Sequence, residues 1–380
     1  MKSLNEIRLA QELIRFRTIK TEDKGIMNFL SKKLSSIGFK CKIIKSKGLD
    51  SKSALNLFAK FGNSKPHINF LGHSDVVLNL NNWSVSPFKG IVKKGYLHGR
   101  GAQDMKGSIA CWISAVSHFI NNKKFKGSLS IIIASDEETS GLGTLTVMKH
   151  LKNKEEKIDF AIVGEPSSNR KVGDEIRIGR RGSMNAKLTV IGKSGHSAFY
   201  GSYRNPCTTL AKIIEKFKNT RLDSGTKYMP PSRLEITRMN VDNLSENVVP
   251  QSAEAYFNVR FNSKYKSSPL KKKLNKIIST IVNKDKCKFK IDYRVSGEAF
   301  YTKPNKEIYM VKKVIKKITG ISTKLNCRGG TSDSRFLGSI PRLELGLRNN
   351  TIHMVDEKTS VSDIKKLTKI YYNILENYFE

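Results

Sequence analysis

The order of apolar and polar residues predicts alternating strands and helices over the first 180 residues. Short apolar runs at 67–72 (HINFLG), 128–135 (SLSIIIAS) and 159–164 (DFAIVG) have the length of buried strands. Residues 107–120 repeat apolar positions at helical spacing, and residues 1–16 have the pattern of an amphipathic helix. This alternation is typical of an α/β sheet that is covered by helices on both faces.

The pattern changes after residue 180. Six segments read in turn as strand, helix, strand, strand, helix and strand: AKLTVIG, NPCTTLAKIIEKF, SRLEITRMNV, SAEAYFNVRF, PLKKKLNKIISTIV and KFKIDYRV. This is the βαββαβ order of a ferredoxin-like fold. The α/β pattern then resumes with a helix near 306–318, a strand at 342–347 (RLELGL) and a closing helix from about 362. We therefore predict an α/β/α domain over 1–180 and 295–380, with a ferredoxin-like domain inserted over 181–294.

Composition narrows the class of protein. The chain has 380 residues, of which 38% are hydrophobic and 27% charged, and none of its apolar runs approaches the length of a membrane span. The N-terminal segment lacks the uninterrupted apolar core of a signal peptide. The five cysteines lie far apart without a C-x-x-C pair, which argues against a disulfide framework and a thiolate zinc site. We expect a cytoplasmic protein that does not associate with a membrane.

The formal net charge of +36 raises the question of nucleic-acid binding. In residues 269–284, however, Leu270, Leu274 and Ile278 form one apolar stripe and the lysines lie elsewhere, and residues 310–320 repeat this arrangement. We find no RNA-binding, zinc-finger or recognition-helix motif. We interpret the lysines as solvated faces that could also attract an anionic substrate, with nucleic-acid contact as the alternative.

Unusual polar clusters occur in five segments, and four of these follow or end a predicted strand. The segments are GHSD (72–75), HGRGAQDMKG (98–107), ASDEETSG (134–141), VGEP (163–166) and NNTIH (349–353). In open α/β sheets, ligands bind at the carboxyl ends of strands. We therefore expect these distant segments to converge.

Each candidate residue also has an ordinary interpretation. His73 and Asp75 share one face of an extended segment, so Asp75 can orient the imidazole, but a polar turn would look the same. Asp104 precedes a predicted helix, where a helix N-cap is the usual role. His353 by itself is typical of a polar loop.

The acidic residues that follow the strands are harder to explain as surface polarity. Glu137 and Glu138 come directly after an apolar strand, where burial is costly unless a cation or a proton compensates the charge. Neighbouring extended residues point to opposite sides, so we expect these two to have different roles. Glu165 ends another strand and is followed by Pro166.

The candidates are more specific as a set than singly. Two histidines and three carboxylates without cysteine suit a hydrolytic site with two metal ions. Two dications carry +4, which three carboxylates and a hydroxide neutralise. The sequence lacks a G-x-S-x-G elbow, a Walker A loop and a G-x-G-x-x-G that opens a helix.

These motifs resemble the dizinc aminoacylase and carboxypeptidase family over nearly the whole chain. The matching segments, in the family's order, are GHSDVV, PFKG, LHGRGAQDMKGSIA, SDEE, VGEPSS, GRRGSMNAKLTV, GGTSDSRF and NNTIH. The resemblance implies two zinc ions, with cobalt or manganese as an alternative in one site. It implies that His73 and Glu165 hold one ion, that Glu138 and His353 hold the other, and that Asp104 bridges them.

The resemblance also implies the remaining roles. Glu137 would be the general base and Asp75 the partner of the histidine ligand, while the inserted domain would form a homodimer and supply His196 as an oxyanion donor to the partner's site. Substrate contacts would come from Arg180, Asn247, Arg260, Thr331 and Asn349. The implied reaction is hydrolysis of an N-acylated amino acid, with N-succinyl-LL-2,6-diaminopimelate favoured. Alternatives are another acylase, for example one acting on N-acetylornithine, and a basic binding protein on an inactive hydrolase scaffold.

Overall fold

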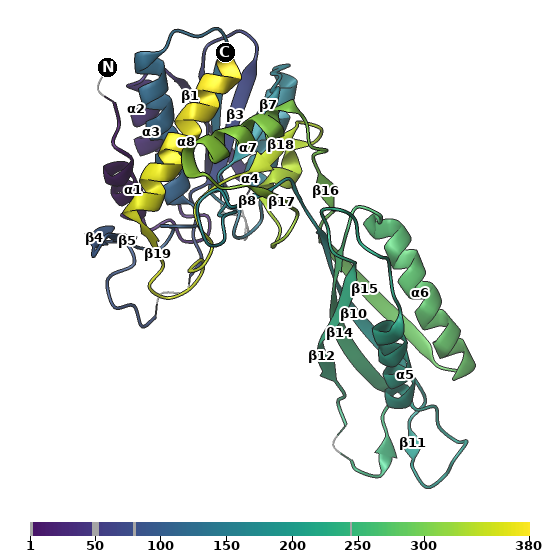
Figure 1. Ribbon diagram of the computed structural model, residues 1–380. Coiled ribbons are helices and arrows are strands. Elements are labelled where there is room, and N and C mark those ends of the chain that lie inside the picture. Colours follow the sequence, from purple (N-terminus) through teal and green to yellow (C-terminus); the bar gives the residue numbers. More distant parts are fainter. Residues whose placement is uncertain (1–2, 48–52, 79–80, 244) are drawn as a thin grey trace. The chain divides into compact units, whose positions relative to one another are not determined.

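The computed structural model describes residues 3–47, 53–78, 81–243 and 245–380 and divides the chain into two compact units (Figure 1). The first unit comprises Met1–Gly179, Thr302–Asn326 and Ser332–Glu380, and the second comprises Arg180–Tyr301 and Cys327–Thr331. For comparison, the sequence pattern placed the inserted domain at 181–294. The strand that ends the pattern, β15 (Lys288–Gly297), runs beyond residue 294.

An eight-stranded mixed sheet forms the centre of the first unit. Its order is β1 (Lys40–Lys47), β2 (Ser53–Phe61), β6 (Ser128–Ala134), β3 (His67–His73), β7 (Phe160–Val163), β18 (Arg342–Glu344), β8 (Glu175–Arg177) and β17 (Lys324–Asn326). β3 is parallel to both β6 and β7. Their carboxyl ends, at His73, Ala134 and Val163, therefore lie at one edge of the sheet.

Helices pack on both faces of this sheet, and its central strands are buried on both sides. On one face, Phe70 of β3 stacks on Trp112 with 4.9 Å between ring centroids, and Trp112 meets Tyr371 edge to face at 5.2 Å. On the other face, Leu71 belongs to a buried cluster with Val147. The helices are α1 (Glu6–Ile14), α2 (Ile26–Ser35), α3 (Lys106–Asn122), α4 (Leu142–Asn153), α7 (Lys306–Thr319) and α8 (Val361–Phe379), with the 3-10 helix η2 (Asp333–Leu337). The α/β/α prediction is confirmed.

A small antiparallel sheet lies beside these layers. It consists of β19 (Lys358–Ser360), β5 (Tyr96–His98) and β4 (Ile91–Lys93). Because β5 and β19 pair in antiparallel fashion, the segment that follows β5 lies beside the loop that precedes β19. Both segments carry candidate site residues.

The strand expected over 342–347 is shorter than predicted, because β18 ends at Glu344. The amide of Leu345 still donates to the carbonyl of Val163, at 2.9 Å. The next two amides donate to serine hydroxyls: Gly346 to Ser167 and Leu347 to Ser108. The chain thus leaves the sheet, and its backbone groups remain satisfied by side chains, which an apolar pattern does not reveal.

The second unit has the predicted ferredoxin-like order. Its antiparallel sheet runs β12 (Arg233–Asn240), β14 (Ser252–Phe261), β10 (Gly182–Ile191) and β15, with helices α5 (Pro206–Asn219) and α6 (Ser267–Lys284). Alternate residues of β10, such as Leu188 and Val190, are buried in one core with Leu210 and Ile278 of the helices. Short two-residue strands form two further pairs: β11 (Gly195–His196) with β13 (Val248–Val249), and β9 (Gly179–Arg180) with β16 (Phe300–Tyr301).

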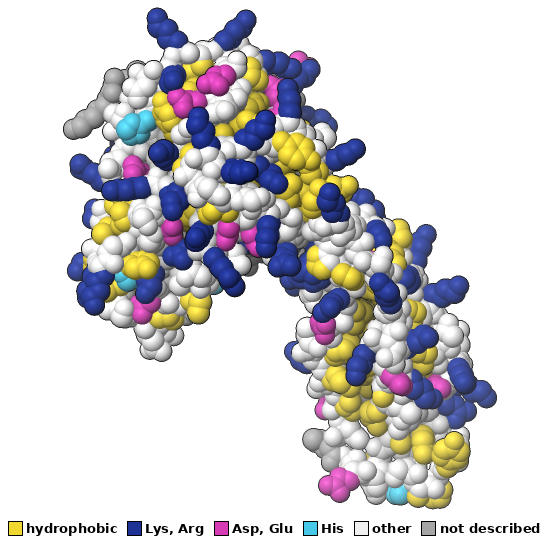
Figure 2. All heavy atoms as spheres, in the orientation of Figure 1, with side chains coloured by type: hydrophobic (Ala, Val, Ile, Leu, Met, Phe, Trp, Pro, Cys, Tyr) yellow, Lys and Arg dark blue, Asp and Glu magenta, His cyan; other side chains and the backbone are white. Residues whose placement is uncertain are grey.

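Within the described ranges, no helix is both long and apolar enough to span a membrane. Lys and Arg side chains are spread over the visible face and project outward, as Figure 2 shows. In α6 the buried positions are Leu270, Leu274, Ile278 and Val282, so the lysines of this helix lie off its apolar stripe, as the sequence pattern indicated.

Candidate metal centre

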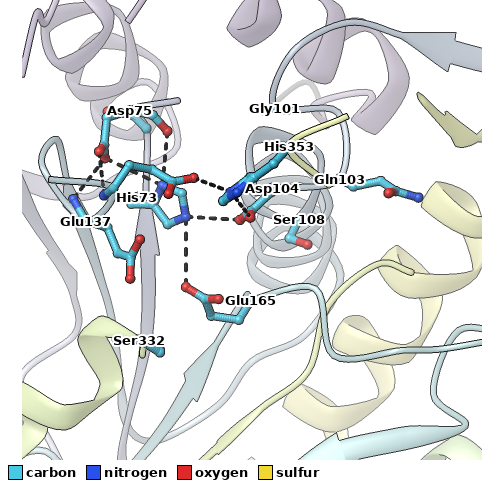
Figure 3. A network of polar contacts seen from close by, with 12 residues as sticks. His73, Asp75, Gly101, Gln103, Asp104, Ser108, Glu137, Glu165, Ser332 and His353 are labelled. Atoms are coloured by element: carbon cyan, nitrogen blue, oxygen red, sulfur yellow. Dashed lines mark hydrogen bonds and ion pairs between the residues drawn. The ribbon is translucent and has the colours of Figure 1, made fainter. Parts of the chain in front are cut away.

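His73 lies at the end of β3 and is fixed through its Nδ1 atom. Nδ1 is 3.1 Å from the backbone carbonyl of Asp75, so its N–H donates to that oxygen. Nε2 then faces two carboxylates, at 3.1 Å from Asp104 Oδ1 and 3.9 Å from Glu165 Oε1 (Figure 3). A neutral imidazole held in this way presents the Nε2 lone pair to a metal ion.

Asp104 connects the two candidate histidines. Its Oδ1 lies 3.1 Å from His73 Nε2 and its Oδ2 lies 3.2 Å from His353 Nε2. The residue directly before α3 is Met105, which makes no side-chain cap, so Asp104 is not the helix N-cap that its position suggested. One carboxylate with its two oxygens directed at different histidines has the arrangement that a bridging ligand needs.

Glu137 and Glu138 lie in a turn, which corrects the expectation that they are extended. β6 ends at Ala134, and the backbone amides of Glu137 and Glu138 donate to the buried carboxylate of Asp75 at 3.2 and 2.9 Å. Both amides bind one carboxylate, so the chain bends there. The two side chains still have different surroundings, because Glu138 Oε1 lies 2.8 Å from His353 Nε2 and Glu137 lies near Glu165.

The ligand atoms form two groups that are compact enough for metal ions. Atoms of His73, Asp104 and Glu138 all lie within 4.8 Å of one another, and the same holds for His73, Glu137 and Glu165. Donors bound tetrahedrally to zinc lie about 3.3–3.6 Å apart, so contacts of 2.8–3.9 Å between the histidines and the acids fit such an ion. By distance alone Glu137 could be a ligand.

Electrostatics point the same way, because the protein gathers acids here although its net charge is +36. Burial raises the pKa of Glu137 well above its usual value, and the nearby charge of Glu165 adds to this effect. For His73, burial acts to lower the pKa, but hydrogen bonds to Asp104 and Asp75 raise it well above its usual value. Hydrogen bonds to Asp104 and Glu138 raise the pKa of His353 to about 10. A cluster of acids that raises the pKa of two histidines in this way also favours the binding of metal cations.

Glu357 is a functional candidate that sequence reasoning missed. It is fully buried and lies four residues after His353. Its carboxylate accepts hydrogen bonds from the guanidinium of Arg100 at 2.9 Å and from the amides of Gly101, Gln103 and Asp104 at 3.1, 2.8 and 3.2 Å. A single acid next to a short strand carries no sequence signal for this role, because its partners are mostly backbone groups.

The second unit brings together two of the other predicted residues. His196 and Asn247 lie beside each other through the pairing of β11 with β13, and the Asn247 amide is 3.3 Å from His196 Nε2. The Ala198 backbone amide donates to His196 Nδ1, and the side-chain nitrogen of Asn247, also a donor, faces Nε2.

The remaining predicted substrate contacts lie in both units. Arg180 is buried and donates to the carbonyl of Gly330, next to the predicted Thr331, and Arg260 lies opposite Arg233 across β14 and β12. Asn349 belongs to the first unit, where its backbone amide donates to the backbone carbonyl of Ser168. Whether these residues meet one substrate stays a prediction.

Comparison with known proteins identifies the family. Residues 70–377 match the family described as Peptidase family M20/M25/M40. The chain belongs to this family. The M20 match covers the strands, turns and loops that carry His73, Asp104, Glu138, Glu165 and His353, and it confirms the resemblance inferred from the motifs.

One curated relative is similar over its entire length. A protein of Pelagibacter ubique (strain HTCC1062) named succinyl-diaminopimelate desuccinylase is 53% identical over 384 residues, covering 100% of both chains. Among solved structures, aminopeptidase PepT from Bacillus cereus has a TM-score of 0.81 at 21% identity, with 99% of this chain and 100% of that chain covered. Bacillus subtilis YxeP, described as a dinuclear metal binding peptidase from the M20 family, has a TM-score of 0.70 at 14% identity and 98% coverage of both chains. These structures support the M20 fold.

Proposed function

We propose that this M20 enzyme removes succinate from N-succinyl-LL-2,6-diaminopimelate and thereby produces LL-2,6-diaminopimelate for lysine biosynthesis. The observation that carries this conclusion is the 53% identity, over both full lengths, to a protein named succinyl-diaminopimelate desuccinylase. The cluster of two histidines and four acids supports hydrolysis. It argues against an inactive hydrolase scaffold, because the cluster includes every predicted ligand.

Two zinc ions would occupy the centre, with cobalt or manganese as an alternative in one site. His73 and Glu165 would hold one ion, Glu138 and His353 the other, and Asp104 both. The directions of the two Asp104 oxygens support this division. Bound divalent ions would polarise the amide carbonyl and lower the pKa of water.

Glu137 acts as the general base rather than as a ligand. It takes a proton from the attacking water and later delivers it to the nitrogen of the leaving amine, which restores the carboxylate. The raised pKa of its carboxyl supports a proton-carrying role. Asp75 holds the amides of Glu137 and Glu138, so it positions both side chains while it orients His73.

His196 of a partner subunit would donate its Nε2–H to the oxygen that becomes negative when water attacks. The hydrogen bond from the Ala198 backbone amide to Nδ1 supports this tautomer, which requires Asn247 to turn its side-chain oxygen toward Nε2. Arg180, Arg260, Asn247, Thr331 and Asn349 would hold the carboxylates and the backbone-like groups of the substrate. Arginine suits this role because its planar fork binds a carboxylate at two points.

A homodimer follows from the same proposal. Phe199 and Tyr200, in the loop after His196, expose 67% and 93% of their surface, which is typical of residues that a partner covers. We expect no sequence-specific nucleic-acid partner and no membrane. We place the reaction in the cytoplasm, where the five free cysteines would stay reduced.

A substrate comparison tests the proposed activity. We expect a higher kcat/KM for N-succinyl-LL-2,6-diaminopimelate than for N-acetylornithine, with release of succinate measured directly. A higher value for N-acetylornithine would transfer the assignment to that deacylase.

Metal removal tests the centre. Chelation should abolish hydrolysis, and zinc should restore it in two steps. Full activity in exhaustively metal-free protein would contradict the dinuclear proposal.

A further inference from the structure

Two loops supply candidate ligands, and they are bonded to each other. Asp104 lies in the segment between β5 and α3, while His353 lies in the loop before β19. The pairing of β5 with β19 brings these segments together, and the amide of Gly99 continues the contact by donating to the Glu357 carbonyl at 3.0 Å.

Side chains from each loop bind the other loop. Glu357, from the loop of His353, accepts hydrogen bonds from three amides in the segment of Asp104 and from Arg100. In return, Gln103 binds the loop of His353: its Nε2 donates to Asn350 Oδ1 at 2.8 Å, and its Oε1 accepts from the amide and the hydroxyl of Thr351 at 2.9 and 2.8 Å. We call Gln103, Glu357 and these bonded groups the loop lock.

His353 depends on such support because packing alone does not position it. Its side chain is 47% exposed, so packing does not fix the imidazole. Its backbone has a φ of 59°, in the left-handed region that side chains other than glycine seldom adopt. A residue in that conformation persists when neighbouring contacts over-determine it.

The other histidine is held differently. His73 ends β3, which is paired on both sides within the central sheet, and Glu165 lies two residues after the end of β7. Strand ladders therefore position the ligands of one ion, whereas the second ion takes His353 from a loop.

We propose that Gln103 and Glu357 are positioning residues whose loop lock sets the separation of Asp104 and His353, and therefore the affinity for the metal ion that these two share. This inference rests on the proposed dinuclear centre. It assigns a role to two buried polar residues that are not among the proposed metal ligands or substrate contacts.

Stepwise zinc titration of metal-free protein against a chromophoric chelator tests the inference. Gln103→Met keeps the length of the side chain but removes its three hydrogen bonds. We expect one of the two binding steps to weaken by about 10–100-fold, the usual effect of removing a residue that orients a ligand, while the other step changes little. Thr351→Val, which removes the hydroxyl contacts to Gln103 and to the backbone of Lys358 but keeps the other two bonds of Gln103, should weaken the same step less.

A matched control separates positioning from general loss of stability. His67 is also buried, lies at the opposite end of β3 from His73, and connects Lys157 with Ser130 through contacts of 2.8 Å on each ring nitrogen. His67→Leu should lower the thermal midpoint and leave both zinc affinities unchanged. Glu357→Gln, which leaves Arg100 without its carboxylate, should match Gln103→Met in the step that it weakens.

The possible outcomes are distinct. Selective weakening of one step in Gln103→Met and Thr351→Val, absent in His67→Leu, supports the loop lock. Unchanged zinc affinities, or equal weakening of both zinc-binding steps, would overturn it. If Gln103→Met does not fold, the result for Thr351→Val decides. Fewer than two zinc ions bound by the wild-type protein would contradict the dinuclear centre instead.

Discussion

Replacing Glu137 by glutamine separates a general base from a metal ligand, and the structure predicts an effect on stability as well as on turnover. Ligand atoms of Glu137 and Glu165 lie within 4.8 Å of each other. At an effective dielectric constant of about 20, two negative charges 4.8 Å apart repel by about 3.5 kcal/mol. The net effect is smaller, because the raised pKa of Glu137 lets a proton remove part of the repulsion.

Glu137→Gln should therefore stabilise the metal-free protein by about 1–3 kcal/mol, equivalent to a thermal midpoint several degrees higher. Bound cations neutralise the same acids, so this gain should largely disappear in the zinc-loaded protein. Turnover should fall by at least about 10²-fold, because an amide cannot accept the proton, while the zinc content stays at two ions. Calorimetry with and without zinc, metal analysis and a succinate-release assay measure the three quantities.

Glu138→Gln is the matched control, since it changes the neighbouring residue in the same turn. Glu138 forms a 2.8 Å ion pair with His353, so its loss should destabilise the metal-free protein and weaken zinc binding. If metal-free Glu137→Gln is no more stable than the wild type, the repulsion argument fails. If Glu137→Gln loses a zinc ion, Glu137 is a ligand and the assignment of the two glutamates must be exchanged.

Three further predictions concern protons and subunits. Zinc binding at pH 8 should release at least one proton, because the pKa of His353 is raised to about 10 and a ligand imidazole must be neutral; calorimetry in buffers of different ionisation enthalpy measures this, and no release would contradict it. Burial lowers the pKa of His67 below its usual 6.5, so the unfolded chain binds the extra proton and stability falls as pH drops below 6.5. Denaturant unfolding should show that this loss of unfolding free energy, at most about 1.4 kcal/mol per pH unit, is absent in His67→Leu. The same dependence of the unfolding free energy on pH in both proteins would refute the prediction. Mixing His196→Ala with Glu137→Ala should restore roughly a quarter of wild-type activity after subunit exchange, since half of the dimers then hold one intact site; no recovery would reject the shared site.

The sequence alone determined the framework of the site. Apolar runs at β3, β6 and β7 are short and bounded, so they could be recognised as strands, and the polar residues that follow them had to lie at one edge once the strands were parallel. His73 and Glu165 could be predicted for this reason. The ferredoxin-like unit could be predicted equally well, because its strands alternate buried and exposed residues and its helices carry one apolar stripe.

Tertiary structure decided how the remaining ligands are held. The turn at Glu137 and Glu138 follows from two amides that bind Asp75, 62 and 63 residues away in sequence. Asp104 faces His353 because Gln103 and Glu357 bind across two loops that lie about 250 residues apart. Local patterns report which residues prefer to be buried. They carry no record of hydrogen bonds between side chains and distant backbone groups, because any amide can serve as a donor, and those bonds form only after the strands and helices have packed.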